Sequence, residues 1–283
     1  MNACQLGSVC VNAILRVREL EYHFPSTDIE ISNAAREFNR VSNHRVVDGC
    51  VACVDGMLLW INTSKEVETD NPKSFFSGHY QDYGINVQAA CDSHCRFVYA
   101  ALAAPGGAND IFAYRRCTLE TQIERLPLGK YVIGDNAYVC TEHLLTPFSG
   151  DAKKKAFNDL YNFHISQCRI RIEMTFGRFT NKWRIFRRPL ELKLDNIGPV
   201  FLCATRLHNF CINEKILEEG DTVLVACVAD GQAGNVLQYV PSTLEVTAVK
   251  GNSMMRDYLV NKLKSNNIRR PVYNCVRNKD ILK

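Results

Sequence analysis

The chain has 283 residues, of which 46% are hydrophobic and 23% charged, and both fractions are ordinary for a globular protein. No apolar run reaches the roughly 18 uncharged residues of a membrane-spanning helix, so no such helix is expected. The N-terminus shows no basic cluster followed by an apolar stretch, so we expect no secretory signal. The thirteen cysteines form no framework typical of a small secreted domain. They favour a reducing compartment, the cytosol or the nucleus.

Basic residues are concentrated in two blocks, although the net charge is only +4. Residues 153–193 hold eleven Lys or Arg against three acids, and residues 250–283 hold nine against two. Such blocks favour a polyanionic partner. A solvated helix face and a solvated tail would give the same charges, so the charge pattern alone does not decide between these interpretations.

The first predicted unit is a helical segment over residues 1–48. Pro25 separates two helices there, and Ser26 or Thr27 can cap the second one. This segment is short for a DNA-reading domain. At the other end of the chain, residues 214–283 form a predicted C-terminal extension. Its last part, residues 250–283, is expected to be a loosely ordered basic tail.

The second predicted unit, residues 49–213, begins with three apolar runs that we interpret as neighbouring strands. A helix capped by Asn109 or Asp110, a short buried strand and a long helix follow. This order predicts an α/β fold of the RNase H-like type, in which a mixed sheet is flanked by helices. The expected bounds of these elements are 50–61, 85–90 and 97–104 for the first strands, a helix to about 123, a strand over 128–133, and helices over 159–183 and 200–214.

Four acidic residues stand in unusual positions of this predicted unit. Asp55 interrupts an apolar strand, where both strand propensity and desolvation disfavour a carboxylate. Asp135 directly follows a buried strand, and Glu173 lies beside the apolar stripe of the long helix. Asp110 begins a helix after a glycine-rich turn. Together these positions point to a site that uses carboxylates.

Each acid also has a purely structural interpretation. Asp110 could be a helix cap, Asp135 the first residue of a turn, and Glu173 a surface partner of Arg169. Nothing local satisfies Asp55. Phosphodiester chemistry uses two divalent ions roughly 4 Å apart, held by carboxylates from different elements, and Mg²⁺ or Mn²⁺ prefers such oxygen ligands.

We therefore predict Asp55, Asp135 and Glu173 as the catalytic, metal-binding core. Asp110 is the fourth predicted metal ligand, at the edge of that core. On the long helix that carries Glu173, we further expect Arg171, Arg178 and Lys182 to face phosphates.

Several motifs occur in order between about residues 47 and 213. They are Val-Asp-Gly at 54–56, Tyr-Gly-Ile-Asn-Val-Gln at 83–88, Pro-Gly-Gly-Ala-Asn-Asp at 105–110, Gly-Asp-Asn-Ala-Tyr at 134–138, Leu-Leu-Thr-Pro-Phe at 144–148 and Arg-Ile-Arg-Ile-Glu-Met-Thr-Phe-Gly-Arg at 169–178. With these motifs the sequence resembles the PIF/Harbinger family of DDE transposases, which includes Harbinger-derived nucleases. In one departure, Met57-Leu58 stands where the family usually shows Thr-His.

The resemblance implies an RNase H-like fold, a divalent metal cofactor and DNA as the substrate. It carries the metal-binding role onto Asp55, Asp110, Asp135 and Glu173. It also implies a Myb/SANT-like DNA-binding partner protein. Separately, we expect a homo-oligomer, and because the basic tail would bind DNA or act as a nuclear import signal, we predict a location in the nucleus. Three functional interpretations stay open, which are a metal-dependent endonuclease or transposase, an inactive DNA- or chromatin-binding descendant, and a protein-interaction module.

Two other groups of residues could carry chemistry. Cys50 and Cys53 form a C-x-x-C pair, but strand residues three apart point to opposite faces, so we expect core cysteines rather than a zinc site. His208 lies among apolar helix residues and is expected to be structural. No phosphate-binding glycine loop of the known classes is present.

Overall fold

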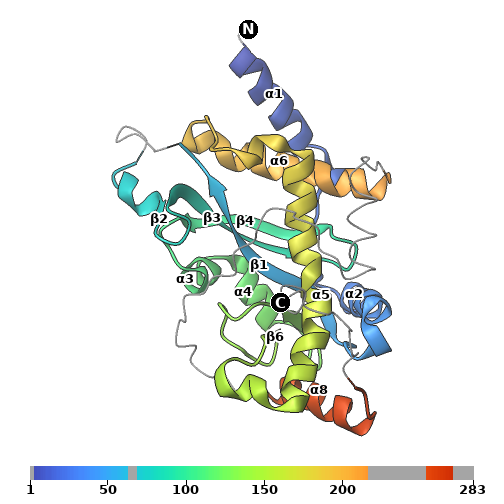
Figure 1. Ribbon diagram of the computed structural model, residues 1–283. Coiled ribbons are helices and arrows are strands. Elements are labelled where there is room, and N and C mark those ends of the chain that lie inside the picture. The colour runs from blue at the N-terminus through green and yellow to red at the C-terminus, as the bar shows by residue number, and fades with distance from the viewer. Residues whose placement is uncertain (1–2, 63–68, 216–252, 270–283) are drawn as a thin grey trace, which may run out of the picture.

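The computed structural model describes residues 3–62, 69–215 and 253–269, which form a mixed sheet with helices packed on its faces (Figure 1). The sheet has six strands, and its central order is β4-β3-β1-β5-β6. Strands β3 and β4 extend it by antiparallel pairing, whereas β5 and β6 run parallel to β1. The strands are β1 (Cys50–Trp60), β2 (Phe76–Ser77), β3 (Asp82–Cys91), β4 (Phe97–Pro105), β5 (Tyr131–Ile133) and β6 (Leu144–Leu145).

This topology confirms the predicted RNase H-like α/β fold. The antiparallel strands β1, β3 and β4, with the two-residue β2 between the first two in the chain, precede a helical connection. The chain then returns to place β5 beside β1. The long helix α5 (Ala156–Lys182) follows and crosses the sheet (Figure 1). Its observed bounds lie close to the predicted range of 159–183. Among the described residues, no helix is both long and apolar enough to cross a membrane.

Two hydrophobic cores lie on the two faces of the sheet. On one face, Cys53 and Leu59 of β1 pack with Ile172 and Phe179 of α5. Helices α6 (Leu194–Asn213) and α8 (Met254–Ser265) contribute to the same core. On the other face, Val54 packs with residues of α3 (Asp110–Arg115) and α4 (Thr118–Glu124). The alternation of strand side chains thus divides β1 between the two cores.

The N-terminal segment contains the two expected helices, α1 (Ala3–Leu15) and α2 (Asp28–Val41). The N-cap of α2 is Thr27, whose hydroxyl accepts a hydrogen bond from the Glu30 amide at 3.3 Å. The Glu30 carboxylate in turn accepts from the Thr27 amide at 3.0 Å, which completes a capping box. Tyr22 anchors the connection to α6 through a 2.8 Å hydrogen bond to Thr205.

Several predicted element bounds were wrong. Strand β3 begins three residues before the predicted start at 85, and α6 begins six residues before the predicted start at 200. The single helix expected after Asn109 is divided into α3 and α4, and Asn109 is the N-cap because its side chain accepts from the Phe112 amide at 2.8 Å. Asp110 is therefore the first helical residue and not the cap. The strand expected from Leu128 begins only at Tyr131, since Leu128 is 89% exposed.

The prediction of a loosely ordered tail was wrong for residues 254–265. These residues form α8, whose Leu259 and Leu263 are buried in the core beside α5. The carboxylate of Glu142 accepts hydrogen bonds from the first amides of α8, and Lys262 pairs with Asp48 near the start of β1. Four basic residues of the predicted tail, Arg270, Arg277, Lys279 and Lys283, lie outside the described residues. So does the segment 216–252, which includes Lys250.

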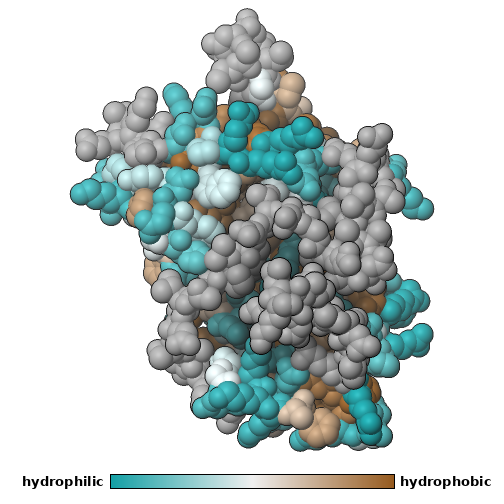
Figure 2. Space-filling view, in the orientation of Figure 1, coloured by the Kyte–Doolittle hydropathy of each residue, from teal (hydrophilic) through white to brown (hydrophobic). Residues whose placement is uncertain are grey.

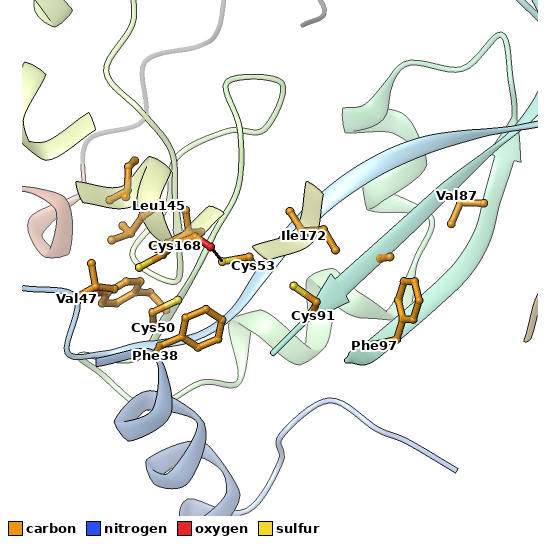
Figure 3. Packing of buried hydrophobic residues seen from close by; sticks show 14 of the residues in the cluster. Phe38, Val47, Cys50, Cys53, Val87, Cys91, Phe97, Leu145, Cys168 and Ile172 are labelled. Carbon is orange, nitrogen blue, oxygen red and sulfur yellow. Dashed lines mark hydrogen bonds between the residues drawn. The ribbon is translucent and has the colours of Figure 1, made fainter. Parts of the chain in front are cut away.

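The side chains of Cys50 and Cys53 are oriented differently from the prediction. Cys50 and Cys53 do not point to opposite faces, because an irregularity in the pairing with β5 between Cys50 and Ala52 shifts the alternation. Both thiols lie in one core with Cys91 and Cys168, and the Cys53 thiol donates to the Cys168 carbonyl at 3.2 Å (Figure 3).

The conclusion that these are core cysteines still holds. Both side chains are fully buried in the hydrophobic core. His208 is also a core residue, as expected. It is buried, and its ring nitrogen Nε2 lies 2.9 Å from the Cys95 carbonyl oxygen.

Candidate active site

The sheet places two of the predicted carboxylates on neighbouring strands. The parallel pairing of β1 and β5 ends with Cys53 opposite Ile133. Two residues further along each chain come Asp55, inside β1, and Asp135, just beyond the carboxyl end of β5. Asp55 is only 4% exposed although it is charged in its ordinary form. The carboxyl end of a strand in an α/β sheet is where catalytic groups commonly lie.

Each of these aspartates is oriented by a backbone amide. The Oδ1 atom of Asp55 accepts a hydrogen bond from the Gly56 amide at 2.8 Å. The Oδ1 atom of Asp135 accepts from the Ala137 amide at 2.8 Å. The turn interpretation of Asp135 is therefore correct, but the same hydrogen bond also fixes the carboxylate beside Asp55.

Helix α5 carries Glu173, and Arg169 on the same helix connects Glu173 with Asp55. The guanidinium of Arg169 lies 2.7 Å from Glu173 Oε1 and 3.7 Å from Asp55 Oδ2. The pair on α5 therefore exists as the surface interpretation predicted, since the two residues are four positions apart. However, the arginine also reaches the buried aspartate of β1, so it connects the helix and the sheet at the site.

Asp110 approaches β1 from the opposite face of the sheet. It lies under Gly56, where a Cβ atom would come within 2.6 Å of Asp110 Oδ1. The side-chain amide of Asn86 donates to that same oxygen at 2.9 Å. Gln88 donates to Asn86 at 2.9 Å and accepts from the Tyr138 hydroxyl at 2.8 Å. A buried polar chain thus fixes Asp110.

The residues of this polar chain were not predicted as part of the site. A signal for them exists in the sequence, because Asn86 and Gln88 are two positions apart and so share one face of a largely apolar strand. A buried polar side chain needs a hydrogen-bond partner. Polar residues at this spacing in a buried strand therefore indicate that the strand faces a polar group, which here is Asp110.

Burial and repulsion between neighbouring carboxylates raise the pKa values of the two strand aspartates. Burial, and then the neighbouring Asp135 carboxylate, raise the pKa of Asp55 well above its usual range, while Arg169 opposes this shift. Burial also raises the pKa of Asp135, against the hydrogen bond from Ala137. Burial together with the charges of Asp110, Asp55 and Asp135 raises the pKa of Tyr80 to about 12. These shifts reflect negative charge gathered in a partly dry site.

The donor set fits a hard divalent cation. All four acids offer oxygen ligands, which suit Mg²⁺ or Mn²⁺ better than zinc. Asp55 Oδ2 is buried and accepts no hydrogen bond, as expected of an atom that needs a cation. In the present arrangement, however, no three acids of the described chain are placed to hold one ion, and Arg169 supplies the positive charge. The metal-binding roles of the four acids stay predictions.

Comparison with known proteins identifies the family. Residues 54–209, more than half of the chain, match the model of the DDE superfamily endonucleases. The chain belongs to this family. The family match and the similarity to an ALP1-like protein confirm the resemblance to Harbinger-type DDE proteins. The matched region begins one residue before Asp55 and ends within α6, so it includes every residue of the candidate site.

One relative in Arabidopsis thaliana, "Protein ALP1-like", is 22% identical over 229 residues. The alignment covers 75% of this chain and 54% of that protein, so the chain spans about half the length of the relative. No solved structure matches the chain.

Proposed function

We propose that this DDE-family chain is a divalent-metal-dependent endonuclease, of the transposase type, that acts on DNA phosphodiesters. The observation that carries the proposal is the buried Asp55, which lies beside Asp135 on the neighbouring strand and faces Glu173 through Arg169. A carboxylate in a strand centre is costly to bury. A role in catalysis best explains why the buried Asp55 carboxylate lies in the region that matches the family.

In this proposal Asp55, Asp135 and Glu173 hold the metal, and Asp110 lies at the edge of the site. Bound divalent ions would activate the attacking water and stabilise the leaving oxygen of the phosphodiester. The Gly56 and Ala137 amides keep the two strand aspartates in fixed orientations, so little reorganisation is needed when the substrate arrives. Asn86 performs the same positioning role for Asp110.

DNA would contact the exposed cations beyond the end of α5. Arg184, Arg187 and Arg188 are exposed there, whereas the earlier candidates Arg171, Arg178 and Lys182 are half-buried. Burial raises the pKa of the Cys95 thiol, and the charges of Arg178 and Arg171 oppose that rise, so these two arginines lie near the core. Hydrophilic residues cover much of the visible part of this end, around α6 (Figure 2). We therefore assign the phosphate contacts to the exposed arginines, because a cation must reach solvent to release counterions from DNA.

Nicking of supercoiled plasmid by the purified chain in Mn²⁺ tests the proposal. The chain should nick DNA, and Asp55→Asn should lose at least about a hundredfold in rate because a metal ligand is removed. Asp195→Asn, at an exposed position of α6, is the matched control and should keep the wild-type rate. DNA binding without any metal-dependent nicking would instead support the alternative, a domesticated DNA- or chromatin-binding protein on the DDE scaffold.

The cellular context follows from the same proposal. A DNA-cleaving protein with free cysteines works where DNA and reducing conditions occur together, which is the nucleus. The family resemblance adds a Myb/SANT-like DNA-binding partner, and we also propose self-association. Imaging of a tagged chain and co-purification from nuclear extract would test these points, and exclusion of the chain from the nucleus would contradict them.

A further inference from the structure

Arg169 lies inside the carboxylate site, yet the proposed function gives it no role. One of its terminal nitrogens is 2.7 Å from Glu173 Oε1, and the other is 3.7 Å from Asp55 Oδ2. Its side chain is only 19% exposed. The guanidinium therefore connects two of the proposed metal ligands, one on β1 and one on α5, at the boundary between the sheet and the helix.

The oxygen atoms that Arg169 contacts are the ones a metal ion would need. Asp55 Oδ2 accepts no hydrogen bond, and Glu173 Oε1 is in direct contact with the guanidinium. Two cations on the same pair of oxygens would repel each other strongly in a partly buried site. Among the described residues, no three acids are placed to hold one ion while the guanidinium lies between Asp55 and Glu173.

We infer that Arg169 is a resident counter-cation, which closes the carboxylate site until a divalent ion displaces its guanidinium from Asp55 and Glu173. The inference rests on the proposed metal-dependent function. It adds that the site exists in two states, arginine-closed and metal-loaded. The arginine stabilises the metal-free protein, because without it the buried Asp55 would lack a nearby positive charge.

A permanent scaffolding role is the competing explanation, and it predicts the opposite sign. If Arg169 only orients Asp55 and Glu173 for the metal, its removal must weaken metal binding. If Arg169 competes with the metal, its removal must strengthen binding, because the closed state no longer lowers the fraction of open sites. The affinity of the free protein for Mn²⁺ therefore separates the two roles without any measurement of activity.

The test is a calorimetric titration of MnCl₂ into the full chain without DNA. Arg169→Gln should bind Mn²⁺ about tenfold more tightly than the wild type, if the closed state predominates by at least that factor. Arg169→Lys should fall between the two, because a lysine ammonium cannot contact both carboxylates as a forked guanidinium does. The matched control is Arg171→Gln, two residues along α5. Burial raises the pKa of the Cys53 and Cys168 thiols, and the charge of Arg171 opposes that rise, so Arg171 faces the cysteine core. It should leave the affinity unchanged.

Thermal unfolding supplies the second readout. Without metal, Arg169→Gln should have a lower Tm than the wild type. Saturating Mn²⁺ should reduce that difference, since the ion replaces the missing positive charge. If Arg169→Gln does not fold, the lysine variant decides the sign by the same titration.

The outcomes separate this inference from the proposed function. Mn²⁺ binding in the wild type with equal or weaker binding in the Arg169 variants would overturn the inference alone. Absence of Mn²⁺ binding in the wild type and in all variants would overturn both. Tighter binding in Arg169→Gln and Arg169→Lys, with the Arg171→Gln control unchanged, would establish the counter-cation.

Discussion

The contact between Gly56 and Asp110 gives a stability prediction whose size follows from the structure. A Cβ atom at position 56 would lie 2.6 Å from Asp110 Oδ1 and 2.9 Å from Gln88 Nε2, whereas an ordinary contact begins at 3.4 Å. Gly56→Ala must therefore move Asp110 by about 0.8 Å (3.4 minus 2.6). Asp110 cannot move freely, because Asn86 donates a hydrogen bond to that same oxygen at 2.9 Å.

The expected cost is the sum of two effects. Overpacking in a fixed environment costs about 1–3 kcal/mol, and loss of one hydrogen bond costs about 1 kcal/mol. Gly56→Ala should therefore lower the free energy of unfolding by about 2–4 kcal/mol, measured by urea denaturation. Gly177→Ala is the matched control. No neighbouring atom lies within 4 Å of a Cβ at that helical position, so this change should stabilise α5 by about 0.5–1 kcal/mol.

A double-mutant cycle then identifies Asp110 as the cause. In an Asp110→Ala background about half of the penalty of Gly56→Ala should disappear, which gives a coupling of about 1–2 kcal/mol between the two positions. The rest stays because the contact with Gln88 Nε2 remains. A neutral or stabilising Gly56→Ala would refute the description of the site. A penalty that stays the same without the Asp110 carboxylate would refute it as well.

Three further predictions concern α8, the charge of the site and DNA binding. Leu263→Ala should destabilise the chain by about 2–5 kcal/mol in urea denaturation, because Leu263 is fully buried in the core; no change would mean that α8 does not pack there. Burial raises the pKa of Asp55, so the carboxyl group of Asp55 binds a proton more tightly in the metal-free folded state than in the unfolded state. The stability of the folded state therefore falls as the pH rises above about 4. Asp55→Asn should therefore be more stable than the wild type at pH 7 in EDTA, with a difference that narrows towards pH 4; a difference that does not depend on pH would contradict the raised pKa. Replacing Arg184, Arg187 and Arg188 by Ala should reduce the salt slope of DNA affinity by about 0.9 for each phosphate that these arginines neutralise, and an unchanged slope would exclude these side chains from the DNA interface.

The features predicted correctly depend on local sequence signals. A cap at Ser26 or Thr27, the three neighbouring strands and α5 follow from capping signals and apolar periodicity, and the structure selects Thr27 as the cap. Asp55 was visible as a possible site residue because no neighbouring side chain in this apolar strand can pair with a carboxylate. The expectation that nothing local satisfies it was wrong for one oxygen, since Oδ1 accepts from the Gly56 amide. Each of these signals lies within a few residues in the sequence, so no knowledge of the tertiary fold was needed.

The features that were missed depend on contacts between distant segments. Arg169 reaches Asp55 across 114 positions, and no local pattern on α5 shows that the arginine points to β1. The apolar stripe of α8, with Leu259 and Leu263 four residues apart, was present in the sequence. The surrounding basic charge concealed it, since a charged segment favoured the prediction of a solvated tail. The irregular pairing near Cys50 likewise depends on the neighbouring strand β5, so the sequence around Cys50 alone does not reveal it.

The structural and catalytic interpretations of the acids are compatible. Asp55 and Asp135 each use Oδ1 to accept a hydrogen bond from a nearby backbone amide, and that local contact fixes the direction of the carboxylate. The second oxygen of Asp55 accepts no hydrogen bond and faces Arg169. A carboxylate held by one oxygen presents the other at a defined place, which is what a metal ligand or a counter-ion requires. The turn at Asp135 and the helical pair of Arg169 with Glu173 therefore support the proposed chemistry, because they position the groups that the fold brings together.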